Sequence, residues 1–238
     1  MFKAAILYKK KTIKINRLSY GQLNYGQILV KIIYSGVCRS QVMEFYEERG
    51  KDKHLPHLLG HEASAIVIDK HKSVKKVKVN DKVILTWIKS KGINADSYKF
   101  LNKNEIINSG KVTTFSEYSI VSENRVVRKP LGLSDKFAPM YGCAFLTGAG
   151  VVINKLKNLN KKKLICVYGL GGVGISSLIA LKSLHFKNLI IIEKDPKKII
   201  IAKKLGYKNV YNVSEIDDLK KIEKIKGKID IAIEAGGS

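Results

Sequence analysis

Three side chains in this sequence have the chemistry of zinc ligands. Cys38 and His61 lie in one stretch near the N-terminus, and Cys143 follows far downstream. Each cysteine offers a thiolate sulfur and the histidine an imidazole nitrogen. Two cysteines and one histidine leave one position of a tetrahedral zinc open, which is typical of a catalytic rather than a structural site. The sequence therefore predicts a single catalytic zinc.

A glycine-rich loop in the second half of the chain predicts a dinucleotide site. It follows an apolar run, Leu164–Tyr168, and opens an expected helix, Gly172–Leu184. The glycines of such a loop allow a tight turn, the approach of a pyrophosphate and close packing of helix on strand. A lone GxGxxG pattern is weak evidence, but this strand and helix context makes it specific. The loop residues expected to contact the cofactor are Gly169, Gly171, Gly172, Val173 and Gly174.

An acidic residue beyond the loop predicts the choice of cofactor. Glu193 follows Gly174 by 19 residues, at the end of the next expected strand. Its carboxylate is expected to accept hydrogen bonds from the adenosine ribose and to repel a 2′-phosphate, which favours NAD over NADP. Three nearby lysines oppose that preference, and one of them, Lys198, is a further candidate for cofactor contact.

An open zinc position together with a nicotinamide site implies hydride transfer at a carbinol carbon. On these pieces the sequence resembles the zinc-containing medium-chain alcohol dehydrogenases. The pieces occur in the family's order and near its spacings: Gly-Val-Cys-Arg-Ser at 36–40, Gly-His-Glu-Ala at 60–63, Thr-Phe-Ser-Glu-Tyr at 114–118, Gly-Cys at 142–143 and Gly-Leu-Gly-Gly-Val-Gly at 169–174. The resemblance implies a small alcohol or polyol as substrate, with an aldehyde or ketone as the oxidised partner.

The resemblance also implies roles for four more residues. Arg39 would reach the cofactor pyrophosphate, and Thr147 would face the nicotinamide. Ser40 would hydrogen-bond the substrate hydroxyl and begin a proton relay. Glu62 would lie close behind the zinc, with a buried carboxylate in an ion pair as the open alternative.

Three departures from the family pattern alter these expectations. Gln41 stands where the family usually has an aspartate that orients the ligand histidine. Met43 stands where many relatives end the proton relay with a histidine. The segment Ile88–Val112 contains no cysteine, and the chain has only three cysteines in total, so a second, Cys₄ zinc site is excluded.

The hydrophobic pattern divides the chain into two expected domains, residues 1–143 and 144–238. Short β-branched and aromatic runs punctuated by turn residues predict a β-rich first domain. The resemblance implies a GroES-like, partly closed barrel there. The expected strands are Lys3–Tyr8, Ile28–Tyr34, Ala63–Asp69, Lys82–Trp87, Phe115–Val121 and Arg125–Arg128. Two helices are expected, at Arg39–Glu48 and at Asp135–Ala149.

From residue 164 onward, strand and helix patterns alternate, which predicts an α/β domain with a doubly wound parallel (Rossmann) sheet. Four strands are expected, the last at Ile229–Ile233, and a helix is expected near Glu215–Lys226. Because such sheets usually have six strands, we expect this one to be incomplete and the chain to be truncated. Full-length relatives are expected to be homo-oligomers. A truncated, inactive zinc- or nucleotide-binding protein is the alternative function.

The net charge of +24 comes almost entirely from lysine, with arginine at only five positions. The lysines are scattered without interleaved aromatic residues, and phosphate and base recognition prefers arginine. We therefore expect no specific nucleic-acid partner. No run of about 18 apolar residues predicts a membrane span. Three cysteines without a pairing pattern indicate a reducing cytoplasm.

Overall fold

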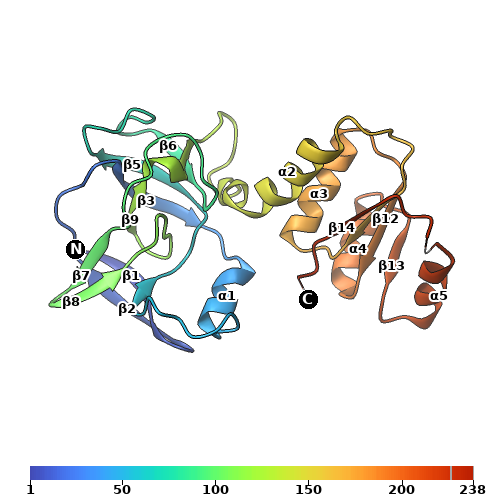
Figure 1. Cartoon of the computed structure of the whole chain (residues 1–238), viewed down its shortest axis with the longest axis horizontal. Coiled ribbons are helices and arrows are strands. Elements are labelled where there is room, and N and C mark those ends of the chain that lie inside the picture. Colours follow the sequence, from blue (N-terminus) through green and yellow to red (C-terminus); the bar gives the residue numbers. More distant parts are fainter. Residues whose placement is uncertain (226, 238) are drawn as a thin grey trace. The chain divides into compact units, whose positions relative to one another are not determined.

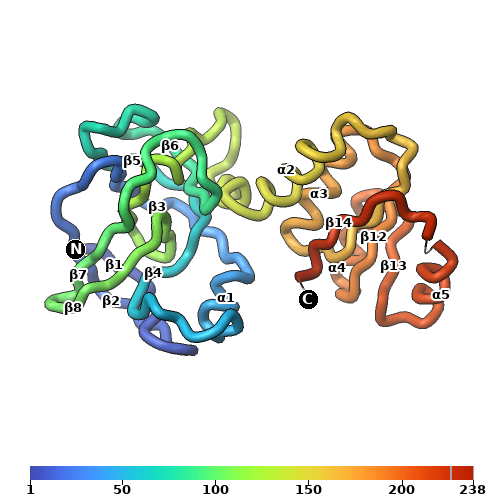
Figure 2. The backbone as a smooth tube through the Cα atoms, in the orientation of Figure 1, coloured from blue at the N-terminus to red at the C-terminus, as the bar shows by residue number. Residues whose placement is uncertain are grey.

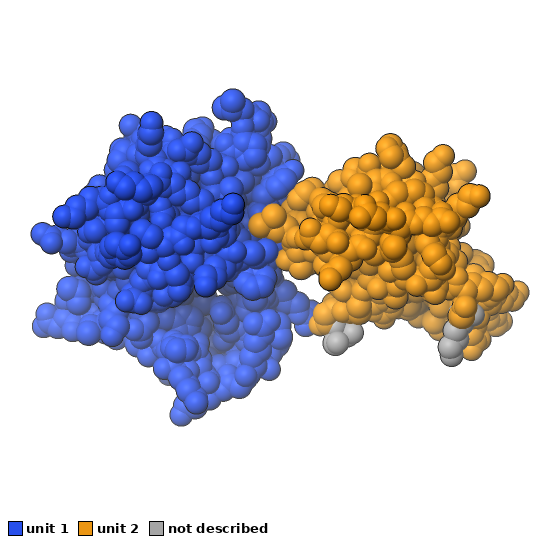
Figure 3. Space-filling view, turned by 45° about the horizontal axis from the view of Figure 1, so that its top comes forward, with its two compact units in different colours: residues 1–143 blue, residues 144–238 orange. Residues whose placement is uncertain are grey.

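The computed structural model describes residues 1–225 and 227–237. Contacts divide the chain into two compact units, Met1–Cys143 and Ala144–Ser238, which are coloured separately in Figure 3. Each unit has its own hydrophobic core. Among the described residues, no helix combines the length and the apolar character needed to cross a membrane.

The first unit contains two five-stranded sheets that curl into the expected GroES-like half-barrel (Figure 1). Their strand orders are β2-β1-β4-β8-β7 and β10-β6-β5-β3-β9. The strands are β1 (Phe2–Lys9), β2 (Thr12–Leu18), β3 (Gln27–Ser35), β4 (His57–Leu58), β5 (Ala63–Lys70), β6 (Lys82–Leu85), β7 (Lys99–Asn102), β8 (Glu105–Asn108), β9 (Tyr118–Ser122) and β10 (Val126–Arg128).

The sequence pattern found β1 and all strands of the sheet β10-β6-β5-β3-β9, and it missed β2, β4, β7 and β8. In β3 and β5 most side chains are β-branched or apolar and many are buried, so the pattern is strong. Strands β2 and β7 form the two edges of their sheet, and most of their side chains are exposed. Edge strands need few apolar residues, and their signal in the sequence is correspondingly weak.

The expected helix Asp135–Ala149 is wrong as a single element. The chain forms a 3₁₀ helix, η2 (Ala138–Gly142), and a separate helix, α2 (Ala144–Leu156), in the second unit. Cys143 between them has φ −144° and ψ −84°, which is not helical. A Cβ atom at Gly142 would lie 2.2 Å from the carbonyl oxygen of Leu85, so the chain passes directly against β6 at this break.

The second unit is a four-stranded parallel sheet with the order β13-β12-β11-β14. The chain path in Figure 2 shows strand and helix alternating, as the sequence predicts. The elements are β11 (Ile165–Tyr168), α3 (Gly172–Ser183), β12 (Leu189–Glu193), α4 (Pro196–Lys204), β13 (Val210–Asn212), α5 (Ile216–Ile225) and β14 (Ile231–Glu234). Lys226, at the end of the expected last helix, lies outside the described residues.

Two side-chain clusters cover the two faces of this sheet. Helices α2, α3 and α4 pack on one face, against residues that include Val167 and Ile191. Cys166 and Ile192, which point to the opposite face, pack with residues of α5. The sheet is therefore covered on both sides, as a parallel sheet requires.

A buried carboxylate holds two loops of the first unit together. The Oε1 atom of Glu123 accepts hydrogen bonds from the backbone N–H groups of Lys75 and Lys76 (2.8 and 2.9 Å), and Oε2 accepts one from Ile93 (2.7 Å). Burial tends to raise the pKa of Glu123, but these three donors and the Lys76 ammonium group lower it below its ordinary value. The ionised carboxylate therefore stabilises the fold.

We predict that Glu123→Gln lowers the free energy of unfolding by about 1–3 kcal/mol at neutral pH, since an amide nitrogen cannot accept a hydrogen bond. Because the folded pKa is depressed, the carboxylate stabilises the fold above its unfolded pKa, and this contribution disappears as the pH falls through the folded value. The difference between the two proteins should therefore shrink in acid. Urea unfolding followed by the fluorescence of Trp87, the single tryptophan, measures it.

The exposed Glu48 provides a matched control for this prediction. Glu48→Gln removes the same charge without touching the two loops, and it should leave the unfolding midpoint nearly unchanged. Equal effects of the two substitutions would contradict the role assigned to Glu123.

Candidate metal centre and dinucleotide loop

Three ligand atoms converge in the first unit. One donor atom each of Cys38, His61 and Cys143 lies within 4.8 Å of the others, and the two sulfur atoms are 4.0 Å apart. Cys38 is the N-cap of α1 (Arg39–Phe45), His61 precedes β5, and Cys143 follows η2. The structure thus brings together the three residues predicted as zinc ligands.

The two cysteines share a proton when no metal is bound. The Cys143 thiol donates a hydrogen bond to Cys38 Sγ, and this contact, followed by the nearby His61 ring, lowers the pKa of Cys38 to about 3. The same contact with Cys38, followed by burial, raises the pKa of Cys143. One cysteine is therefore a thiolate at neutral pH and the other a thiol, and a metal that binds both sulfurs must displace that proton.

The donor set fits zinc. His61 Nε2 is buried and has no hydrogen-bond partner among the described residues, whereas His61 Nδ1 lies 2.7 Å from Gln41 Nε2. A buried ring nitrogen is costly without a partner, and a metal ion between it and the two sulfurs would provide one. Thiolate and imidazole donors with a fourth position open match the chemistry of catalytic zinc.

Glu62 follows the candidate ligand His61 in the chain and is not one of the three clustered residues. The residue is buried, and its Oε2 atom has no hydrogen-bond partner among the described residues. Burial has the largest effect on the Glu62 carboxyl group and raises its pKa. The nearby His61 lowers this pKa, and Cys38 raises it further. No ion pair to Glu62 is found among the described residues, and its placement behind the metal stays a prediction.

The other residues given roles by the resemblance lie in three places. Ser40 is half-buried in α1, with Oγ 3.1 Å from Gln41 Nε2. Arg39, the first residue of α1, is exposed. Thr147 lies on α2, in the other unit.

The glycine loop has the local geometry that a pyrophosphate needs. Gly169 has φ +90°, and a Cβ atom at Gly174 would lie 1.9 Å from the Gly169 carbonyl oxygen, so strand and helix meet closely here. A Cβ atom at Gly171, the N-cap of α3, would meet nothing within 4 Å. The space beside Gly171, at the N-terminus of α3, is therefore open, and an anion can approach the start of the helix there.

Glu193 is tied to this loop through the backbone. Its Oε2 atom accepts a hydrogen bond from the Leu170 N–H group (2.6 Å), and Oε1 accepts from the N–H groups of Lys194 and Asp195 (2.8 and 3.0 Å). Burial tends to raise its pKa, but these donors, with Lys198 Nζ at 3.9 Å, lower it. The carboxylate is therefore ionised. Its hydrogen bond from Leu170 stabilises the glycine loop whether or not a ribose is bound.

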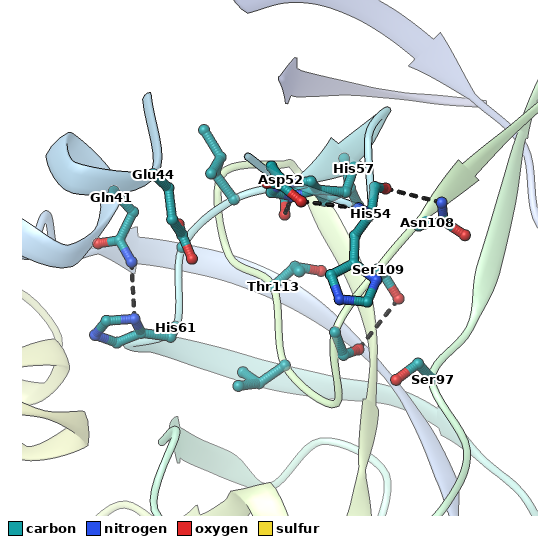
Figure 4. A pocket seen from close by; sticks show the side chains of 15 residues that line it. Gln41, Glu44, Asp52, His54, His57, His61, Ser97, Asn108, Ser109 and Thr113 are labelled. Carbon is teal, nitrogen blue, oxygen red and sulfur yellow. Dashed lines mark hydrogen bonds and ion pairs between the residues drawn. The ribbon is translucent and has the colours of Figure 1, made fainter. Parts of the chain in front are cut away.

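A cavity of about 470 Å³ in the first unit was not predicted (Figure 4). Gln41, His61 and Glu44 line it, together with Asp52 and His57, which are joined by a 2.7 Å hydrogen bond. Burial raises the pKa of Glu44. Asp52 lies in the loop before β4 and His57 begins this two-residue strand, so no periodic pattern marks the pair, although both residue types are visible in the sequence.

The sequence of the first unit is similar to a known protein family. Residues 24–131 match the family described as the alcohol dehydrogenase GroES-like domain. Over these residues the chain is therefore similar to that domain.

Two curated proteins resemble nearly the whole chain. Alcohol dehydrogenase class-2 isozyme 2 of Oryctolagus cuniculus is 29% identical over 99% of this chain and 71% of its own length. S-(hydroxymethyl)glutathione dehydrogenase of Photobacterium damsela subsp. piscicida is 26% identical over 81% of this chain and 58% of its own length. The chain thus spans 58–71% of these relatives.

Among solved structures, benzyl alcohol dehydrogenase from Acinetobacter calcoaceticus superposes with a TM-score of 0.84 at 24% identity, covering 100% of this chain and 71% of that protein. At this identity the likeness establishes the fold, a GroES-like domain followed by part of a Rossmann-like sheet. Together with the family match and the curated relatives, it confirms the resemblance to alcohol dehydrogenases.

We predict that purified protein holds one zinc per chain. Cys38→Ser or Cys143→Ser should lower zinc affinity by roughly 100-fold or more, because loss of a metal ligand should cost more than loss of a residue that only hydrogen-bonds a ligand. Metal analysis after gel filtration measures both. Cys166→Ala is the control, because Cys166 lies in the sheet of the second unit. Two tightly bound zincs, or equal zinc content in all variants, would show the ligand assignment to be wrong.

Proposed function

We propose that the chain is a zinc- and NAD-dependent oxidoreductase that transfers hydride between an alcohol or polyol and the nicotinamide. The observation that carries this proposal is the convergence of Cys38, His61 and Cys143, with their donor atoms within 4.8 Å. The similarity to alcohol dehydrogenases supports it. Because the chain covers only part of its relatives' length, the activity of the whole protein is part of the proposal.

In this proposal Cys38, His61 and Cys143 hold the zinc. When bound, it would act as a Lewis acid that polarises the substrate oxygen and favours loss of the hydroxyl proton. Two thiolates balance the charge of the ion, which moderates its acidity and suits a reaction that runs in both directions.

Ser40 would handle the substrate proton. Its hydroxyl lies beside Gln41 at the start of α1, two residues after the ligand Cys38. A serine hydroxyl can accept a hydrogen bond from the substrate and donate one in turn. Met43 has no group that could continue this relay, so the proton must leave by a route that does not use this position.

The second unit would bind the cofactor. The open N-terminus of α3 suits the pyrophosphate, and Glu193 would accept hydrogen bonds from the adenosine ribose with the lone pairs that its backbone donors leave available. Lys198 lies close enough to Glu193 to contact the same part of the cofactor. Arg39 would supply a planar guanidinium to the phosphates.

The substrate class stays broad in this proposal. The names of the relatives include a class-2 alcohol dehydrogenase, an S-(hydroxymethyl)glutathione dehydrogenase and a benzyl alcohol dehydrogenase. Their shared chemistry is oxidation of a carbinol to a carbonyl. We therefore propose a small alcohol or polyol and its aldehyde or ketone as the substrate pair.

The proposed activity is tested by incubating zinc-loaded protein with NAD and a panel of simple alcohols, polyols and glutathione adducts. We expect absorbance of NADH to appear with at least one class and to vanish in Cys38→Ser. Cofactor binding without reduction of NAD across the panel would instead favour an inactive zinc- or nucleotide-binding protein.

We predict that NAD binds at least tenfold more tightly than NADP. A buried carboxylate beside a 2′-phosphate suffers like-charge repulsion of about 1–3 kcal/mol, of which 1.4 kcal/mol corresponds to tenfold in affinity. Calorimetric titration with each cofactor measures the ratio. Glu193→Gln should reduce the ratio of NAD affinity to NADP affinity, because Lys198 could then attract the 2′-phosphate without an opposing carboxylate. Equal affinities in the unsubstituted protein would show that the neighbouring lysines already outweigh the carboxylate.

A further inference from the structure

Gln41 lies between two of the proposed zinc ligands. It is only 5% exposed, and its side-chain amide touches three groups. Oε1 accepts a hydrogen bond from the backbone N–H group of Cys38 (3.0 Å). Nε2 lies 2.7 Å from His61 Nδ1 and 3.1 Å from Ser40 Oγ.

The Cys38 contact fixes the orientation of the amide. A backbone N–H group is a donor in every state, so it requires the amide oxygen on its side. Turning the amide over would place its NH₂ group against this N–H group at the same distance. The Ser40 hydroxyl does not oppose either orientation, because it can donate or accept. The amide NH₂ group therefore faces His61.

This orientation selects one tautomer of His61. Because the amide NH₂ group donates to Nδ1, Nδ1 must carry a lone pair, and the proton of the neutral ring is on Nε2. Yet Nε2 is the nitrogen that is buried without a partner, whereas Nδ1 is held by Gln41. A metal bound through Nε2 needs its lone pair there and the proton on Nδ1.

Metal binding through Nε2 thus leaves Gln41 with two donors to satisfy. The Cys38 N–H group and the His61 Nδ1–H group would both point at one amide, which has a single oxygen. Whichever way the amide is turned, one donor meets its NH₂ group. Only a side chain with two acceptor oxygens can satisfy both.

We propose that Gln41 is a positioning residue that holds metal-free His61 in the tautomer protonated at Nε2 and thereby weakens zinc binding. Loading of the metal then requires the proton of His61 to move to Nδ1 and disrupts a buried hydrogen bond. This inference rests on the proposed zinc site. It predicts an exchangeable metal in a protein whose three ligands are otherwise well placed.

The decisive variant is Gln41→Glu, which keeps the length and shape of the side chain and supplies two acceptor oxygens. We expect zinc affinity of the full chain to rise about 10- to 100-fold, the range over which partners of metal-bound histidines act. Competition with a chromophoric zinc chelator measures it. Val42→Glu is the matched control. Val42 is 44% exposed in the same helix, so this substitution adds the same charge on the surface rather than beside His61.

A second readout does not depend on activity or on metal. Nitrogen NMR of ring-labelled, metal-free protein should show His61 protonated at Nε2 in the unsubstituted chain and at Nδ1 in Gln41→Glu. A proton on Nδ1 in the unsubstituted chain would overturn the proposal. So would an affinity gain no larger than that of Val42→Glu.

The two proposals fail in different ways. If zinc binds and Cys38→Ser removes it, but Gln41→Glu has no effect, only the role of Gln41 is wrong. If zinc affinity is the same in the unsubstituted chain and in Cys38→Ser, the metal centre itself is wrong, and the weakening role of Gln41 fails with it.

Discussion

The approach of two sulfur atoms to one imidazole nitrogen is the constraint on which the first unit depends. Cys38 and Cys143 are 105 positions apart in the chain, yet their sulfurs lie 4.0 Å from each other. Glu62, next to His61, joins the three ligand segments. The carbonyl oxygen of Glu62 accepts a hydrogen bond from the Gly36 N–H group (3.0 Å). A Cβ atom at Gly142 would lie only 3.0 Å from the Cβ atom of Glu62. Gly36, two residues before Cys38, and Gly142, directly before Cys143, thus allow the backbones of these segments to approach the segment of Glu62 closely.

The charges of the site are set by burial and by close donors rather than by the composition of the chain. The protein carries a net charge of +24, but the largest shifts in the pKa values of Cys38 and Cys143 come from the contact between these two side chains. The hydrogen bond from Cys143 favours the thiolate of Cys38, and the same contact, followed by burial, disfavours the thiolate of Cys143. The same logic holds at Glu193, where backbone N–H groups outweigh burial. Each of these buried anions is thus stabilised mainly by hydrogen-bond donors beside it.

Sequence reasoning succeeded for the strands whose burial imposes a pattern. The three candidate ligand residues and the glycine loop stand out in the sequence because few residue types suit a metal ion or so tight a turn, and their roles stay predictions. The strands of the parallel sheet are recognisable because they are buried on both faces and read as continuous apolar runs, as in β11 and β12.

The rest depends on contacts that no local pattern encodes. Strands β2 and β7 are stabilised by pairing at a sheet edge, so their own residues carry little signal. The break at Cys143 follows from the passage of Gly142 against β6, a contact between distant segments. The position of Gln41 was visible as a departure from the family. Its conflict with His61 was not, because it arises from the Cys38 N–H group that fixes the amide.

X-ray absorption at the zinc edge tests the central claim most directly. The account predicts a first shell of two sulfur atoms near 2.3 Å and lighter ligands near 2.0–2.1 Å, one of them with the outer scattering of an imidazole ring. A shell without sulfur, or one of four sulfurs, would contradict the assignment of Cys38, His61 and Cys143 as the metal ligands.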